Sequence, residues 1–432
     1  MHLAQRAFAL LLLTAVLAIT GIWSSEPGFS ELWRIPAGVL LIGLAFEAAL
    51  LRKAPLTVGI ETAPWAFLGR EQPAAFAFGN ESRRALTVEY APVVPAGFEP
   101  QTRVRRVTVP ARGSVRDSVA LVPIHLGPQS WPALAARVLG PLGLAWWSKE
   151  LHPLGQIVIA PDTLRSRRRA PRGNPAGARS RRVMGAGSEL HQLRGYLYGD
   201  PLARIDWKAT ARARELVTRE FSEDQHLDIL VAIDAGRFSR VRVGRLDRFG
   251  MYANVAARFA ELVTPNDDRI GLLVFSDQPL VACPPGRGLP AVTRLRRTLE
   301  QVCVRPAESD PTAAAVRIRA MLRHRSLVVM LTDLDDANVA DQLARAVRLL
   351  SPPHLVVVAG VQSGEIAELA RREARDWSDP WVALAAQEHE ARASAQRLLL
   401  RRLGAPVIAA RAELLEQAVL AEYEALRRSR RV

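Results

Sequence analysis

The sequence predicts three kinds of structure in succession: two transmembrane helices, an all-β sandwich, and an α/β domain with a doubly wound sheet. Two apolar runs lie close together near the N-terminus, short β-branched runs separated by turn residues follow, and apolar runs then alternate with amphipathic stretches. The expected boundaries are 1–53 for the helical hairpin, 54–162 for the sandwich, 163–184 for an Arg-rich linker, 185–225 for an unusual polar segment, and 226–432 for the α/β domain with its C-terminal helices.

The first two apolar runs are long enough to cross a bilayer as helices. Ala7–Trp23 contains no charged residue, and Ile35–Leu51 contains only Glu47. Each run has about 17 residues, which is the lower limit for spanning the hydrocarbon core. No small-x-small cleavage site follows the first run, and a second apolar run comes soon after it, so a hairpin is favoured over a cleaved signal peptide. A hairpin buried in a soluble core is the alternative.

The cations around these runs predict their orientation. Arg6 precedes the first run and Arg52 and Lys53 follow the second, whereas the connecting loop carries two glutamates and only Arg34. Since positive residues stay on the cytoplasmic side, we expect a protein of the inner membrane that crosses it twice and has both termini in the cytoplasm.

Charge and cysteine content agree with a cytoplasmic location for most of the chain. Net charge is +15, from 58 basic and 43 acidic residues, and Cys283 and Cys303 show no spacing typical of a disulfide framework or a metal knuckle. The run Arg165–Arg182 is rich in arginine, proline and glycine without apolar periodicity, which predicts an extended linker. Such a linker is expected to lie near anionic lipid. Nucleic-acid binding is less favoured, because the run lacks interleaved aromatic residues.

Residues 56–160 read as short strands separated by Gly, Pro and Asn turns, which predicts a sandwich of roughly seven strands. Within this region Pro141–Trp147 is conspicuously apolar. Core packing or contact with a membrane surface explains that run better than a ligand site does.

The chain beyond Leu227 predicts a parallel sheet covered by helices on both faces. Strand-like runs occupy 227–234, 268–276, 325–334, 354–361 and 405–410, and amphipathic stretches at helical spacing separate them. In such sheets the functional crevice lies at the carboxyl ends of the strands. Asp234 and Asp333 stand at two of these ends, and Ser309 or Thr312 precedes a helix, so a divalent cation with oxygen ligands is one hypothesis for this edge.

This arrangement is similar to the von Willebrand factor A-like fold, whose metal-binding loop reads Asp-x-Ser-x-Ser. Here the loop is Asp234-Ala235-Gly236-Arg237-Phe238, so both hydroxyl positions are lost and Arg237 adds a positive charge. The sequence therefore predicts a degenerate site without a required cofactor. Mg²⁺ is the expected ion if Asp234, Ser309 and Asp333 do bind one.

The segment Gly187–Phe221 mixes Asp, Arg, Trp and Tyr without a clean period. It resembles the hallmark of the bacterial domain of unknown function 58 family (DUF58), which runs Gly-Ser-Glu-Phe, Leu-Arg, Tyr, Gly-Asp, Arg-x-Ile-Asp-Trp-Lys, Ala-Arg and Arg-Glu-Phe. Leu190 replaces the usual Phe, and Gly140–Leu144 resembles the family's Asp-Pro-Phe-Gly-Leu motif without its Asp and Phe. The residues expected to form the signature or a docking surface are Glu189, Leu193, Arg194, Tyr196, Gly199, Asp200, Arg204, Asp206, Trp207, Lys208, Arg212, Arg219 and Glu220.

The resemblance implies a non-enzymatic partner of a MoxR-type AAA+ ATPase, in an envelope or stress-related role. A catalytic role for the segment is not favoured, because it offers no nucleophile paired with a base and no phosphate-binding loop. We expect internal ion pairs, such as Asp206 with Arg204 or Arg212, and a Trp207 side chain packed against the sheet. Two alternatives stay open: a metal-dependent ligand-binding protein using Asp234 and Asp333, and a nucleic-acid binder using the linker.

Overall fold

The computed structural model describes residues 2–23, 28–52, 56–163, 183–223, 227–302, 304–334, 337–362 and 364–428. The predicted linker 163–184 lies almost entirely outside these residues, and so do Lys53 and Cys303. The chain divides into two compact units, Met1–Ala160 and Pro161–Val432, each of which is described by itself.

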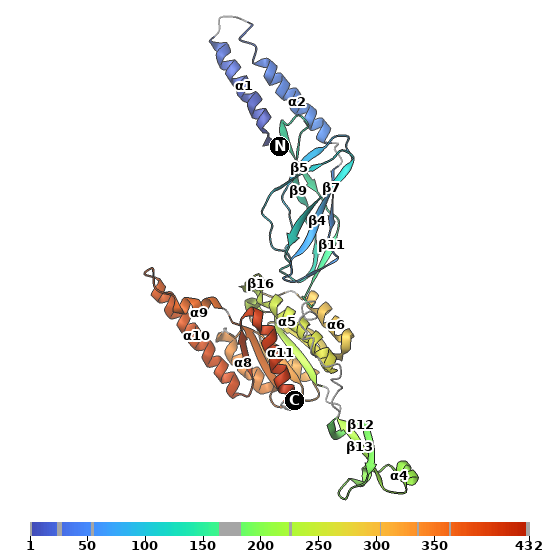
Figure 1. The fold of residues 1–432 in the computed structure, drawn as a ribbon. Helices are drawn as coiled ribbons and strands as arrows, with labels where there is room; N and C mark the ends of the chain where they lie inside the picture. The colour runs from blue at the N-terminus through green and yellow to red at the C-terminus, as the bar shows by residue number, and fades with distance from the viewer. Residues whose placement is uncertain are drawn as a thin grey trace. The chain divides into compact units, whose positions relative to one another are not determined.

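The helices α1 (Gln5–Ile22) and α2 (Arg34–Arg52) run side by side as a hairpin (Figure 1). Both are long and apolar enough to cross a membrane, with a mean hydropathy of 1.8 over 18 residues. Only 11% of the residues are buried in the first window and 28% in the second, whereas a core helix of a soluble domain would be mostly buried. The two helices therefore expose a large apolar surface within the described structure.

The rest of the first unit is β-rich. Phe76 and Phe78 are buried and alternate with partly buried residues on β4, and both contact the buried ring of Tyr90. The strands form three sheets, in the orders β1-β10-β9-β5-β6, β3-β11-β8 and β2-β4-β7. Their bounds are β1 His2–Leu3, β2 Leu56–Glu61, β3 Trp65–Phe67, β4 Gln72–Asn80, β5 Leu86–Tyr90, β6 Arg105–Val109, β7 Gly113–Leu121, β8 Gly127–Ser130, β9 Leu134–Leu139, β10 Ala145–Leu151 and β11 Gln156–Ala160. This unit has more strands than the roughly seven predicted. Short strands such as β3 and β8 were missed, because three or four residues are too few to show a period.

A stripe of buried residues on α2 faces the rest of the unit. Leu40, Gly43, Glu47 and Leu51 are all buried and follow one another at spacings of three and four residues. Such spacing places them on one face of the helix. A Cβ atom at residue 43 would lie 2.5 Å from the Leu144 side chain, so glycine lets that side chain pack closely against the helix.

Glu47 ties this helix to the loop before β10. Its fully buried carboxylate accepts hydrogen bonds from the backbone N–H groups of Leu142, Leu144 and Ala145 at 2.9, 3.2 and 3.1 Å. It also accepts one from the Trp147 indole at 3.3 Å. A buried carboxylate is tolerated only when such donors replace water, so this glutamate is a structural link between the two elements.

The N-terminal helix contacts the same loop. The N–H group of Ala4 donates to the Leu144 carbonyl at 2.8 Å, and the Arg6 guanidinium donates to the Leu142 carbonyl at 3.1 Å. A Cβ atom at Gly140 would collide with the Glu47 carboxylate, so glycine is needed for the close approach. The apolar run Pro141–Trp147, which was predicted to pack in a core or on a membrane, thus contacts both helices of the hairpin.

The second unit contains a six-stranded mixed sheet in the order β18-β17-β14-β19-β20-β21, with helices on both faces. Each predicted strand occurs, and the strands pair in parallel except β18, which pairs antiparallel at one edge. Strand β18 was not predicted, because it contains Pro284 and Pro285, which only an edge strand tolerates. The bounds are β14 Asp228–Asp234, β15 Arg242–Val243, β16 Leu246–Asp247, α5 Arg248–Val263, β17 Arg269–Phe275, β18 Pro279–Arg287, α6 Gly288–Glu300, α7 Pro311–Met321, β19 Leu327–Leu331, α8 Ala337–Leu350, β20 Leu355–Val361, α9 Gly364–Arg371, α10 Asp379–Arg402, β21 Val407–Ala410 and α11 Ala412–Arg428.

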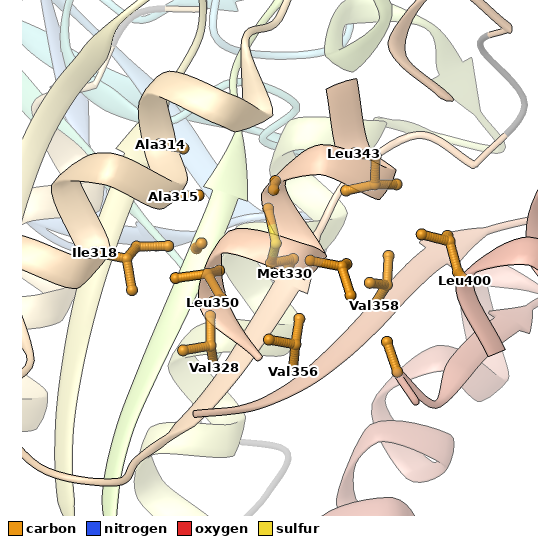
Figure 2. Packing of buried hydrophobic residues seen from close by; sticks show 14 of the residues in the cluster. Ala314, Ala315, Ile318, Val328, Met330, Leu343, Leu350, Val356, Val358 and Leu400 are labelled. Carbon is orange, nitrogen blue, oxygen red and sulfur yellow. The ribbon is translucent and has the colours of Figure 1, made fainter. Parts of the chain in front are cut away.

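The core on one face of this sheet joins α7, α8 and α10 to the central strands. Figure 2 shows Ile318 of α7, Leu343 of α8 and Leu400 of α10 converging on residues of β19 and β20. Met330 and Val358 point from the strands into the same cluster, and all five side chains are fully buried. On the other face, the ring of Phe259 in α5 packs against Tyr423 in α11 with centroids 5.4 Å apart.

Candidate functional site

The segment with the family-like pattern forms an antiparallel hairpin of β12 (Val183–Gly195) and β13 (Val217–Glu223). Between the strands lie a short 3-10 helix, Leu202–Arg204, and the helix α4, Trp207–Ala213. Backbone hydrogen bonds close this excursion at its base: Tyr196 N–H donates to the Leu216 carbonyl, and Asp206 N–H to the Val217 carbonyl, each at 2.8 Å. The hairpin is therefore held by its own backbone.

Asp200 braces the first turn of the excursion. The Arg194 guanidinium donates two hydrogen bonds to its carboxylate at 2.8 and 2.9 Å, and the Leu197 N–H donates a third at 2.9 Å. The bonds from Arg194 and Leu197 lower the pKa of Asp200 below its usual value. Gly199 has a φ of 105°, which a side chain would strain.

Asp206 braces the second half. Its carboxylate caps α4 by accepting hydrogen bonds from the N–H groups of Lys208 and Ala209, each at 3.0 Å, and it pairs with Arg219 at 2.9 Å. The Ala209 N–H and the Arg219 side chain lower the pKa of Asp206. The predicted pairing with Arg204 or Arg212 was wrong, because the bridge between Ile205 and Thr218 brings the neighbours Asp206 and Arg219 together across the strands.

The outward side chains of this hairpin are unusually apolar. Trp207 was predicted to pack against the sheet, but its side chain is 66% exposed, and Tyr198 is fully exposed. We call this group the signature surface: Leu193, Leu197, Tyr198, Leu202, Trp207 and Leu216. Lys208, Arg212 and Arg214 are exposed on the same hairpin, and no carboxylate in the described part of the chain pairs with them. The side chains of Glu189 and Glu220 lie outside what the structure describes.

Replacing Asp206 with alanine should loosen α4 selectively. The amide protons of Lys208 and Ala209 lose their acceptor, so we expect their hydrogen exchange to accelerate by about fivefold to tenfold, while amides of the six-stranded sheet are unchanged. Hydrogen–deuterium exchange of the full chain measures both. Asp206→Asn keeps one acceptor oxygen and should have a smaller effect; equal exchange in Asp206→Ala and the parent would contradict the capping role.

A polar cluster lies at the carboxyl ends of β14 and β19. Asp234 accepts hydrogen bonds from the hydroxyls of Ser309 and Thr332 at 2.5 and 2.7 Å, and from the Gly236 N–H at 2.9 Å. A Cβ atom at residue 236 would collide with the Ser309 hydroxyl. The glycine at position 236 is therefore what lets Ser309 reach Asp234.

Asp333 pairs instead with Arg248, the first residue of α5, and both side chains are at least nine-tenths buried. Sequence reasoning missed Arg248, whose only local signal is its place after the helix-capping Asp247. It named Arg237, but that side chain pairs with the exposed Glu308. The structure thus brings Asp234 and Ser309 into direct contact and gives Asp333 a separate, cationic partner.

These contacts decide what the cluster offers chemically. A divalent cation needs several open oxygen ligands, yet the carboxylate oxygens of Asp234 already accept three hydrogen bonds. Next to Asp333, the guanidinium of Arg248 supplies the positive charge that a metal would bring. As arranged, the residues do not fit a bound divalent ion, and no group of His, Cys, Asp and Glu side chains within the described ranges has metal-binding geometry.

Part of the chain is similar to a known protein family. Residues 192–392, just under half of the chain, match the family described as "Protein of unknown function DUF58". Uncharacterized protein Rv1480 of Mycobacterium tuberculosis and Uncharacterized protein Mb1516 of Mycobacterium bovis are each 25% identical over 153 residues, which is 35% of this chain and 48% of the relative. The chain therefore spans about half the length of the curated relatives it matches.

Solved structures show weaker similarity. Conserved hypothetical protein BatB from Bacteroides thetaiotaomicron is 13% identical with a TM-score of 0.29, and the match covers 46% of this chain and 99% of that one. The CARDB domain of the PF1109 protein from Pyrococcus furiosus is 11% identical with a TM-score of 0.19, covering 25% and 96%. Scores this low carry no argument about function.

Proposed function

We propose that this chain is a non-enzymatic, membrane-anchored adaptor that presents its signature surface and α/β domain in the cytoplasm to a MoxR-type AAA+ ATPase, in envelope or stress-related assembly. The supporting observation is the signature surface, which holds its own shape through Asp200 and Asp206 while exposing Tyr198 and Trp207. Exposed aromatic side chains on a backbone held rigid by internal hydrogen bonds are typical of the anchor residues of protein interfaces.

The charge of the signature surface supports an acidic counterpart on the partner. Arg194 and Arg219 are neutralised by Asp200 and Asp206, whereas Lys208 and its neighbouring arginines point outward. Such cations raise the association rate with an acidic face and contribute less to the final affinity. We therefore expect salt to slow binding of the ATPase more than it speeds dissociation.

The anchor in this proposal is the hairpin of α1 and α2. Their exposed apolar side chains support insertion in a bilayer, and the cations at their ends support cytoplasmic termini in the inner membrane. Reporter fusions test this orientation. Activity of a periplasmic reporter in the Ser24–Arg34 loop, and of a cytoplasmic reporter at the C-terminus, is the expected result; the reverse pattern would remove the basis of the proposal.

Substitution of the exposed aromatics is expected to abolish partner recovery. In detergent extracts of the native cell, under ATP-trapping conditions, Tyr198→Ala with Trp207→Ala should lower the yield of co-purified AAA+ ATPase by about tenfold or more. The unfolding midpoint should stay unchanged, because both side chains are mostly exposed.

The matched control for this experiment is Trp381→Ala, whose side chain on α10 is exposed to nearly the same extent at 68%. It should leave the yield unchanged. Recovery of no AAA+ ATPase with the parent chain would count against the adaptor. A lower unfolding midpoint in the double variant would show that the aromatics pack within the chain itself, which would contradict docking.

Metal-dependent ligand binding through Asp234 and Asp333 is the competing proposal. Calorimetric titration of the full chain with Mg²⁺, Mn²⁺ and Ca²⁺ distinguishes the two. Saturable metal binding that Asp234→Ala abolishes would favour the metal-dependent ligand-binding protein over an adaptor that needs no cofactor. For nucleic-acid binding, the required result is steeply salt-dependent binding that disappears when residues 165–182 are deleted.

A further inference from the structure

The six-stranded sheet ends in a strand whose outer edge pairs with no other strand of the described chain. Strand β21 is the last in the sheet and pairs in parallel with β20. The N–H group of Val358 donates to the Pro406 carbonyl at 2.9 Å, and that of Gln362 to the Ala410 carbonyl at 2.8 Å. Since alternate residues of a strand face the same neighbour, Val407 and Ala409 direct their backbone groups away from the sheet.

Of the two outward-facing residues, Ala409 is partly exposed, whereas Val407 is buried. In the described chain no group accepts a hydrogen bond from the N–H of Val407 or Ala409. The Val407 carbonyl accepts a hydrogen bond from the Arg401 guanidinium at 3.3 Å. The guanidinium has further N–H donors that could bind a ligand. An edge of this kind can pair with an added extended strand.

A groove of about 630 Å³ runs along this edge. One wall is a face of α10, formed by Ser394, Arg397, Leu398 and Arg401 at spacings of three and four residues. The opposite wall is α11, and the floor is β21 itself. The Leu398 side chain is 50% exposed, so the groove combines apolar contact with polar walls.

The charges in the groove select its occupant. Arg397 donates to the Ser394 hydroxyl and Arg401 to a backbone carbonyl, and neither pairs with a carboxylate in the part of the chain that the structure describes. On the α11 wall, the groove is lined by Glu422. A carboxylate is therefore favoured on the α10 side and disfavoured on the α11 side.

We propose that this groove binds an extended peptide segment of a protein partner by adding it as a strand to β21, with an acidic side chain on the Arg397 and Arg401 wall. Successive side chains of a strand point to opposite faces. Acidic residues should thus occupy alternate positions of the segment, and small or basic residues the positions between them. This site is independent of the signature surface and of the ATPase proposed to dock there.

Selection from a random peptide library, with the full chain in lipid nanodiscs as the target, tests the proposal. The expected result is enrichment of peptides that are rich in β-branched residues and carry Asp or Glu at alternate positions. Fluorescence anisotropy of the labelled peptides should then show saturable binding. Matched peptides with Lys in place of the acidic residues should bind about tenfold more weakly or worse.

Two variants distinguish the contribution of backbone pairing to peptide affinity from the contribution of the arginine charges. Ala409→Pro removes an outward N–H group that β20 does not use, and edge strands tolerate proline there, so the fold should persist while affinity falls by about tenfold. Arg397→Glu with Arg401→Glu should reverse the preference to Lys peptides. Arg402→Glu, the adjacent cation outside the groove, should leave binding unchanged.

Several results would overturn the proposal: no peptide with saturable binding, equal enrichment on the Ala409→Pro chain, or no preference for acidic residues. A concentration-dependent dimer that Ala409→Pro abolishes would show that a second copy of the chain occupies the edge instead. If Ala409→Pro lowers the unfolding midpoint, its loss of affinity is not informative. The test then rests on Arg397→Glu with Arg401→Glu, because both side chains lie on the surface of α10 and their replacement should not affect folding.

Discussion

Replacing Arg248 with methionine is expected to destabilise the α/β domain by about 3–5 kcal/mol, since it leaves Asp333 buried without its cationic partner. Methionine keeps much of the volume, so the cost is mainly electrostatic rather than a cavity. Denaturant unfolding of the full chain, followed by a probe in the six-stranded sheet, measures the change in the free energy of unfolding.

Two controls isolate the charge effect. Arg248→Met combined with Asp333→Leu removes both charges and should recover most of the lost stability, because a buried ion pair and an apolar pair of similar volume are often equivalent. Arg392→Met removes a partner of the exposed Glu388 and should change stability by less than about 0.5 kcal/mol. If the double variant is as unstable as Arg248→Met alone, the ion pair is not the reason for the loss.

The same variant tests the metal hypothesis. With Arg248 gone, Asp333 and the nearby Asp234 become the strongest oxygen ligands at this edge of the sheet. We expect Mg²⁺ to stabilise Arg248→Met more than the parent chain, because a divalent cation can then replace the lost guanidinium charge. Equal stabilisation of the parent by Mg²⁺ would favour a metal site in the native chain over the arginine-paired arrangement.

Replacing Glu47 with leucine is expected to release the loop before β10 from the helical hairpin. Three backbone N–H groups and the Trp147 indole lose their acceptor at once, and each orphaned buried donor costs about 1–3 kcal/mol. Hydrogen exchange of the Leu144 and Ala145 amides, measured on the full chain in nanodiscs, should accelerate by about tenfold to hundredfold.

Gly140→Ala gives an independent route to the same result, since its Cβ atom would displace the Glu47 carboxylate. Glu47→Gln keeps one acceptor oxygen and should show a smaller effect. Phe46→Leu, an exposed apolar change on the same helix, should leave both amides as protected as in the parent. Unchanged protection in Glu47→Leu would mean that other contacts hold the loop.

Local sequence patterns predicted most of the elements. The strands β14, β17, β19, β20 and β21 and the long amphipathic helices occur where apolar periodicity placed them, and so do the two N-terminal apolar helices. Periodicity is a local property, because a side chain's face follows from its position within its own helix or strand. Two elements of the α/β domain were missed: β18 contains adjacent prolines, and α9 has only eight residues, which is short for a periodic pattern.

For the candidate sites, the sequence located the segment but not its contacts. It singled out Asp200, Asp206, Asp234 and Asp333, and all four accept charged or hydroxyl donors in the structure. The predicted partners of Asp206 and the packing of Trp207 were wrong. For Asp206, residues close in sequence were favoured over Arg219, which only strand pairing brings near. For Trp207, an apolar side chain was expected to be buried, but it is 66% exposed.

The sequence by itself thus determined the elements of the fold, the apolar hairpin and the location of the signature segment. Only the tertiary structure decided that Arg248 neutralises Asp333, 85 residues away, and that Glu47 binds the N–H group of Leu144, 97 residues away. Charge pairing and backbone capping depend on distance in space, and no periodic pattern encodes which distant residues will meet. A lone glutamate in an apolar run reads in sequence as an exception to a membrane helix, and in the fold it is the residue that joins that helix to the β-rich region.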